Sequence, residues 1–278
     1  MKIKSKFTIW PTLAALALGM FATPVIGQQQ DTSLTQAQRA HQIIGKQVMS
    51  SDNQKIGTLD EMVVDLESGH ILYAVVGASN GKIAVAPGVF TQTTGPSLMV
   101  NETKAKLDAA PQFTSTIAQP NQMGQASFVA QVCQYYGQPA WWQGSAPVNQ
   151  GSFHNVHRLT QLSGTQVKDV NNTPLGKVST EIVDLPAGRI LFVILAPASR
   201  LNLDSNLYAL PPDALTLASN QKTLVSNLNQ QQLASAPHFT NSSWPNFADP
   251  AYASQIYQHY GKQAWFQGGA SQVQPTGR

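Results

Sequence analysis

The sequence has one cysteine, Cys133, among its 278 residues, so no disulfide can form within the chain. A lone thiol in an exported protein could pair between two chains. A thiol on the apolar face of a helix instead packs as a small hydrophobic side chain. Cys133 stands in the apolar stripe of an expected helix, which favours the buried interpretation.

Charge is also scarce, at 11% of residues against roughly 25% in a typical globular protein. Three of the 17 basic residues, Lys2, Lys4 and Lys6, lie at the very start of the chain. The remainder carries 14 basic and 14 acidic residues. With no basic surplus and no basic run after this start, the sequence predicts no nucleic-acid partner.

Motifs of the common catalytic classes are missing. The sequence has no nucleophile elbow, HExxH motif, phosphate-binding glycine loop or CxxC pair. His154 and His157 have an HxxH spacing, but two histidines without a third ligand make a weak metal signal. We therefore predict no catalytic residue, no cofactor-binding residue and no metal ligand.

The first 27 residues read as a targeting segment. The three lysines precede an apolar run over 7–26, and Val25 and Gly27 suit the small-residue positions before a cleavage site. We predict a signal peptide over 1–27, cleaved after Gly27, and a periplasmic or secreted protein. The alternative is an uncleaved N-terminal anchor, which would hold the remainder at a membrane.

The rest of the chain is an internal repeat. At a spacing of 119 residues, Gly45 matches Gly164, Gly57 matches Gly176 and Asp65 matches Asp184. The phrase YYGQPAWWQG at 135–144 returns as HYGKQAWFQG at 259–268, with six of ten letters identical. The order of the matching segments is the same in both copies, which indicates two homologous domains.

Each copy has the pattern of short strands and tight turns. MVVDL and ILYAVVGA in the first copy are rich in β-branched residues and flank the turn LESGH. Asp65 and Asp184 each precede such a turn, closed by Gly69 or Gly188. We expect their carboxylates to accept turn N–H groups rather than to bind a metal. His70 matches Arg189 of the other copy, and this exchange of polar residues predicts a surface position.

An amphipathic helix carries the aromatic phrase in each copy. In the second copy Asp249 is the expected N-cap, Pro250 the first helical residue and Gly261 the stop. The aromatics that end or follow the helices form a candidate binding surface: Tyr136, Trp141, Trp142, Tyr260, Trp265 and Phe266. The alternative is that these side chains fold back and cover the strands. A small aromatic compound or a glycan would suit an exposed surface of this kind.

The repeated motifs resemble the PRC-barrel domain. They run Gly-x-x-Val, a turn, Gly-x-Val/Leu, a V/I-V-D-L strand, Gly, an apolar strand and L-x-x-A-P-x-F, over about 43–113 and again over 161–239. The family includes the H chain of the photosynthetic reaction centre and the C-terminal domain of a ribosome maturation factor. The resemblance implies a compact all-β barrel and an adaptor role.

Together these patterns predict an all-β-dominated fold of two small PRC-type β-barrels in tandem, each with a short amphipathic helix and an aromatic tail. The expected parts are the signal peptide (1–27), a polar N-terminal segment (28–40), repeat 1 (41–144), a linker (145–160), repeat 2 (161–268) and a disordered tail (269–278).

The expected function is a non-catalytic binding or scaffold protein of the bacterial cell envelope with a protein partner. One alternative is an enzyme or cofactor-handling protein with a site between the barrels. Another is a membrane-anchored assembly factor, if the N-terminal segment is retained.

Overall fold

The computed structural model describes residues 34, 36–142, 152–201, 203, 206–218, 222–264 and 266. The expected signal peptide and the expected C-terminal tail lie outside the described residues, and so do residues 145–151 of the expected linker. We call residues 36–142 the first half and residues 152–266 the second half.

The elements of the first half are, in chain order, β1 (Gln38–Arg39), η1 (Ala40–Gln42), β2 (Gln47–Met49), β3 (Lys55–Asp65), β4 (His70–Ala78), β5 (Gly81–Val85), η2 (Pro87–Val89), β6 (Phe90–Gln92), β7 (Ser97–Val100), α1 (Lys104–Asp108), α2 (Pro120–Met123) and α3 (Ala126–Tyr135).

Those of the second half are β8 (Val156–Arg158), α4 (Leu159–Leu162), β9 (Gln166–Asp169), β10 (Pro174–Asp184), β11 (Arg189–Pro197), η3 (Ser199–Leu201), β12 (Asn206–Leu210), η4 (Pro212–Ala214), β13 (Leu215–Leu217), β14 (Thr223–Ser226), α5 (Gln230–Ala234), β15 (His238–Thr240) and α6 (Pro250–His259).

The two halves repeat one pairing scheme. In the first half β2 pairs antiparallel with β3 and parallel with β7, and β3–β4, β4–β5 and β6–β7 are antiparallel pairs. In the second half β9 pairs antiparallel with β10 and parallel with β14, and β10–β11, β11–β12 and β13–β14 are antiparallel pairs. The long hairpins β3–β4 and β10–β11 dominate each half, because their apolar runs are buried on both faces.

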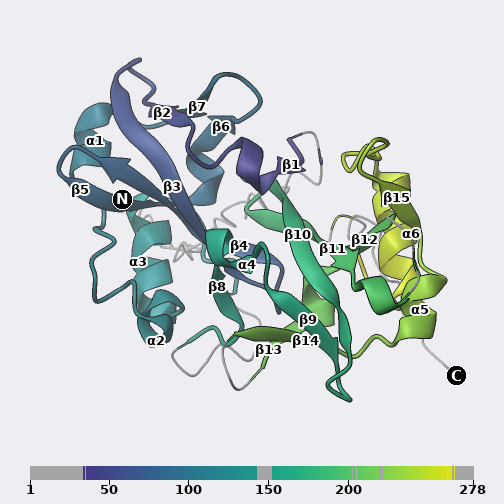
Figure 1. The fold of residues 1–278 in the computed structure, drawn as a ribbon. Coiled ribbons are helices and arrows are strands. Elements are labelled where there is room, and N and C mark those ends of the chain that lie inside the picture. Colours follow the sequence, from purple (N-terminus) through teal and green to yellow (C-terminus); the bar gives the residue numbers. More distant parts are fainter. Residues whose placement is uncertain are drawn as a thin grey trace, which may run out of the picture. The chain divides into compact units, whose positions relative to one another are not determined.

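A strand-rich architecture is confirmed, but the strands do not separate into two distinct barrels. They form one mixed sheet through the pairing of β4 with β11 (Figure 1). At this junction Ile71 N donates to Gly188 O at 2.9 Å, and Ile190 N donates to Gly69 O at 3.0 Å. The 119-residue spacing of the repeat converts one bond into the other, so the two hairpin tips make the same contact with each other, as in a local pseudo-twofold arrangement.

Each half also lends its first strand to the other. β1 pairs with β10, with Gln38 opposite Val183. β8 pairs with β3, with His157 opposite Val64. These two registers are equivalent at the 119-residue spacing of the repeat, so the exchange is reciprocal. Residues 38–40 of the expected polar segment and 156–160 of the expected linker therefore form part of the fold.

One glycine in each long hairpin, Gly57 or Gly176, allows a backbone oxygen of the paired strand to approach closely. A Cβ on Gly57 would lie 1.9 Å from Gly77 O, and a Cβ on Gly176 would lie 2.1 Å from Ala196 O. Neither oxygen can move away without breaking the hairpin, because both belong to the backbone. The match of Gly57 and Gly176 in the sequence thus reflects a packing requirement.

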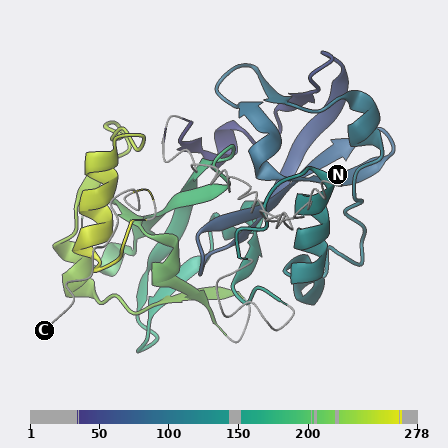
Figure 2. The ribbon, with the colours of Figure 1, turned by 180° about the vertical axis from the view of Figure 1, so that it is seen from behind.

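The helices that carry the aromatic phrase begin and end as expected. Asp249 Oδ1 accepts from Ala251 N at 2.9 Å, Pro250 is the first residue of α6, and Gly261 follows with φ +64°. Gly137 ends α3 with the same φ. In both views α3 lies against strands of the first half and α6 against strands of the second (Figures 1 and 2). Within the described ranges, the helices are too short or too polar to span a bilayer.

Candidate functional site

The first aromatic phrase packs against the sheet. Tyr136 is 4% exposed and its hydroxyl donates to Ala84 O at 3.3 Å. Trp142 is also buried, with its ring edge-on to Phe153. Trp141 is half-buried and stacks on His70 with ring centroids 3.5 Å apart. Most of this aromatic area is therefore used in internal packing.

The second phrase is similar where it is described. Phe266 is buried against Tyr257, and Tyr260 is half-buried. Burial raises the pKa of the Tyr260 hydroxyl. Trp265 lies outside the described residues. As a binding surface, the six aromatic residues remain a prediction, and the five that are described offer little open area.

His70 is not at the surface, so the expectation drawn from its exchange with Arg189 is wrong. It is 8% exposed, beneath Trp141, and its Nδ1 lies 3.1 Å from Nη1 of Arg189. Burial and the neighbouring Arg189 charge lower the pKa of His70 to about 2. The two matching residues lie opposite each other at the junction of the halves, where β4 pairs with β11.

The expected role of the hairpin aspartates is confirmed. Asp65 Oδ2 accepts from Ser68 N at 3.0 Å, and Asp184 Oδ1 accepts from Ala187 N at 3.1 Å. These are side-chain-to-backbone bonds that close the turns before Gly69 and Gly188. The two carboxylates stabilise the hairpin tips that form the junction.

The two histidines of the HxxH sequence do not face a common point. His154 is exposed, whereas His157 is half-buried with Nε2 3.0 Å from Asn155 Oδ1. Burial lowers the pKa of His157 to about 4. Over the described residues, no three His, Cys, Asp or Glu side chains gather closely enough to hold a metal ion.

Cys133 is buried in α3, as the apolar stripe predicts. Burial raises the pKa of its thiol to about 11. A protonated, covered thiol reacts slowly with oxidants and with other thiols. The structure therefore favours the packing role over a disulfide between two copies of the protein.

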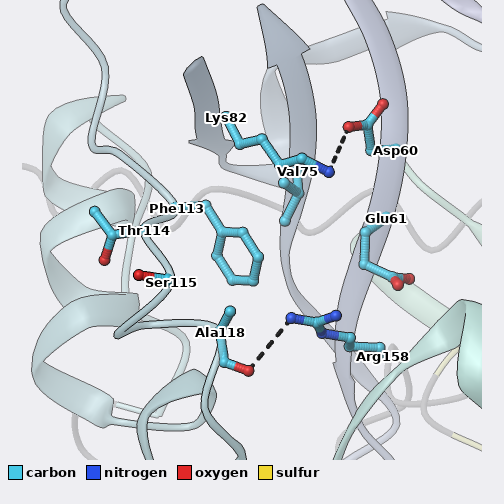
Figure 3. A pocket seen from close by; sticks show the side chains of 9 residues that line it. All are labelled: Asp60, Glu61, Val75, Lys82, Phe113, Thr114, Ser115, Ala118 and Arg158. Carbon is cyan, nitrogen blue, oxygen red and sulfur yellow. Dashed lines mark hydrogen bonds and ion pairs between the residues drawn. The ribbon is translucent and has the colours of Figure 1, made fainter.

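Strand exchange creates a cleft that the sequence reasoning missed. β8 carries Arg158 from the second half to the edge of β3, where the residue faces the first half. The resulting cavity has a volume of about 250 Å³ (Figure 3). It is lined by Asp60, Glu61, Val75, Lys82, Phe113, Thr114, Ser115, Ala118 and Arg158. Extending the repeat alignment upstream, where Arg39 matches Arg158, is the one sequence signal that could have pointed to it.

The charged groups of this cleft are held in different ways. Lys82 Nζ pairs with Asp60 at 2.8 Å. Arg158 Nη2 donates to Ala118 O at 3.3 Å, and the guanidinium lies 5.7 Å from the centroid of the Phe113 ring. Figure 3 shows the guanidinium reaching across the floor of the cleft towards Ala118.

Glu61 is turned towards α4. Its Oε1 accepts from Met62 N and Thr160 N, each at 3.0 Å, and its Oε2 accepts from the Thr160 hydroxyl. The carboxylate is thus bound to the neighbouring half by the second residue after the exchanged strand. The bonds to backbone N–H groups tie the carboxylate to a structural role.

A second buried glutamate, Glu181, lies close to this contact. It is 2% exposed, and its two carboxylate oxygens are 3.4 and 3.5 Å from Ser163 Oγ. Burial raises the pKa of Glu181 to about 7, and the charge of Glu61 adds to the effect. The region where the halves exchange strands therefore contains a carboxyl group that titrates near neutrality.

The equivalent position in the second half is closed by aromatic side chains. Arg39 of β1 lies 4.6 Å from the centroid of the Trp244 ring, as Arg158 lies over Phe113. Trp244 packs in turn against Phe239 and Phe247. The two arginines occupy matching places, but the first half leaves a charged cleft where the second has an aromatic cluster.

Comparison with known proteins covers the first half. Residues 36–107 match the PRC-barrel domain family. No curated protein matches this sequence. The match spans about a quarter of the sequence and includes β1 to β7, of which β3, β4 and β5 carry residues that line the cleft. The first half is thus similar to a PRC-barrel domain over its whole sheet.

Proposed function

We propose that this protein is a non-catalytic binding or scaffold protein of the bacterial cell envelope, with PRC-type halves in tandem. The observation that carries the proposal is how the polar groups are used. Glu61, Asp65 and Asp184 bind backbone N–H groups that hold turns or join the halves. Such groups position a framework, whereas a general acid or base must be able to reach a substrate.

The tandem arrangement is supported by the pairing scheme. Residues 166–226 repeat the strand order and the parallel pairing that residues 47–100 display. The reciprocal exchange of β1 and β8 further favours a fixed platform, because each half supplies an additional strand to the long hairpin of the other. A fixed platform of two similar halves suits an adaptor that holds a partner.

The test is capture of a partner from envelope extract with tagged residues 28–278. We expect the same protein to be recovered in repeated experiments and to be absent when an unrelated exported protein of similar size is the bait. Failure to recover any reproducible partner would contradict the adaptor role. The intact mass of the exported protein checks the localisation, since a mature N-terminus at Gln28 excludes the retained anchor.

An enzyme or cofactor-handling protein is the second candidate, because the cleft of Figure 3 combines residues of both halves. Arg158 and Lys82 could bind an anionic substrate there. Turnover of a small anionic compound that disappears with Arg158→Gln would favour this candidate over the scaffold.

A further inference from the structure

Arg158 is a cation in a cleft without an acidic partner. No carboxylate of the described residues lies within 4.0 Å of its guanidinium, although Asp60 and Glu61 line the same cavity. Asp60 is paired with Lys82, and Glu61 is engaged by Thr160. A guanidinium has five N–H donors, and the Ala118 carbonyl accepts from one.

The surroundings of Arg158 hold it ready for a planar anion. The Ala118 carbonyl and the Phe113 ring fix one edge and one face of the guanidinium. A carboxylate can accept two parallel bonds from the remaining donors, which is the geometry that favours arginine over lysine at such sites. Thr114 and Ser115 add hydroxyl groups to the same wall.

Charge and size narrow the ligand further. Asp60 and Glu61 would repel a doubly charged anion more strongly than a singly charged one. A volume of about 250 Å³ is below the roughly 300–1,000 Å³ of sites that enclose a whole small molecule. Val75, Phe113 and Ala118 provide apolar contact beside the cation. The cleft thus suits a carboxylate on a short apolar stem, which is the end group of a larger molecule.

We propose that the cleft binds a polypeptide carboxylate through Arg158, with the adjoining apolar atoms of the peptide against Phe113. The inference rests on the proposed function and names the chemistry of the partner. The carboxylate comes either from the C-terminus of the partner or from an acidic side chain.

The test is a titration of residues 28–278 with three N-acetylated tripeptides. One is Ala-Ala-Leu with a free C-terminal carboxylate, one is the same peptide amidated, and one is amidated Ala-Glu-Leu. Binding is followed by NMR shifts of the backbone amides of Phe113, Thr114 and Ser115. We expect binding by a carboxylate-bearing peptide in the millimolar range, as is typical of a single anchored end group, and at least about tenfold weaker binding by the amidated Ala-Ala-Leu.

The protein offers a matched control. Arg158→Gln should weaken carboxylate binding at least about tenfold. Arg39→Gln removes the equivalent arginine, which lies over Trp244, and should change the affinity by less than about twofold. Asp60→Asn removes a repelling charge from the cleft and should strengthen binding about threefold. This gain keeps the test decisive if Arg158→Gln proves unstable, because a merely structural residue would not increase affinity.

The outcomes separate the two proposals. Tighter binding of the free-acid peptide identifies a C-terminus, and tighter binding of the Glu peptide identifies a side chain. Equal binding of the amidated Ala-Ala-Leu, an equal loss in Arg39→Gln, or no binding by either acid overturns the carboxylate site. A partner captured equally well by Arg158→Gln also overturns it, yet leaves the scaffold proposal standing.

Discussion

The two halves share a framework but differ at matching positions beside the exchanged strands. Arg158 of the second half lies over Phe113 of the first half beside a cleft, whereas Arg39 of the first half lies over Trp244 in an aromatic cluster of the second half. On the long strands that receive the exchanged strands, Glu61 of β3 corresponds to Thr180 of β10, and Met62 corresponds to Glu181. The halves thus share their strand pairing and differ in the polar groups that lie between them.

The largest expected effect tests the shared framework. Gly57→Ala and Gly176→Ala should each lower the free energy of unfolding by about 3 kcal/mol or more, because the new methyl group would collide with a backbone oxygen. Gly88→Ala is the matched control, since its methyl group would meet the flexible Gln138 side chain. Urea denaturation measures all three. A large loss of unfolding free energy in only one of the two hairpin variants would show that the two hairpins do not contribute equally to stability.

The second prediction concerns Glu181, which has no acidic counterpart in the first half. Its folded-state pKa of about 7 exceeds the ordinary value of 4.5, so the native state binds the proton more tightly than the unfolded chain. The contribution of Glu181 to the free energy of unfolding should therefore be fully present below about pH 4.5. It should be lost as the pH rises to about 7, a decrease of at most about 3 kcal/mol.

Replacing Glu181 with Gln should remove this slope and make the protein more stable than wild type at pH 8. Denaturation curves between pH 4.5 and 8 give the comparison, and Met62→Gln at the equivalent position serves as the control without a titrating group. An unchanged slope in Glu181→Gln would place the responsible group elsewhere.

A smaller effect is expected at two matching contacts beside the exchanged strands, Thr160 with Glu61 and Thr180 with His41. Thr160→Val removes a hydroxyl bond to the Glu61 carboxylate and should cost about 1–2 kcal/mol. Thr180→Val removes a contact of 3.2 Å with His41, whose pKa is lowered by burial, and should cost under about 1 kcal/mol. Thermal unfolding of the two variants measures both losses. A loss in Thr160→Val no larger than that in Thr180→Val would show that the Glu61 contact does not stabilise the fold.

The smallest expected effect is at Cys133, whose counterpart in α6 is Tyr257. Because the thiol is buried and its pKa is raised to about 11, a thiol reagent at pH 8 should label the native protein at a small fraction of the rate for the unfolded chain. Timed mass spectrometry with and without urea measures this difference. Rapid native labelling would mean that α3 detaches from the sheet.

Sequence patterns predicted the features that depend on neighbours along the chain. The turns after Asp65 and Asp184, the cap at Asp249 and the stop at Gly261 each follow from a few adjacent residues. The burial of His70 could not be predicted in this way, because the residue that covers it, Trp141, is 71 positions away.

The cleft escaped prediction for the same reason. Alternation along a strand indicates which face is buried, but not which of several apolar strands becomes the neighbour. β8 is three residues long and stands in a polar region, so nothing local showed that Arg158 would cross to β3. The repeat identifies equivalent residues, whereas only the structure shows that each half pairs its first strand with the other half.

The reciprocal exchange of β1 and β8 also sets the order of folding events. When residues 36–142 have been synthesised and the second half has not, β1 has no β10 to pair with and β3 has no β8. The contact between Gln38 and Val183 spans more than half of the sequence, and contacts of such long range form slowly. The first half must therefore wait for the second, and the protein reaches its final structure only after synthesis of both is complete.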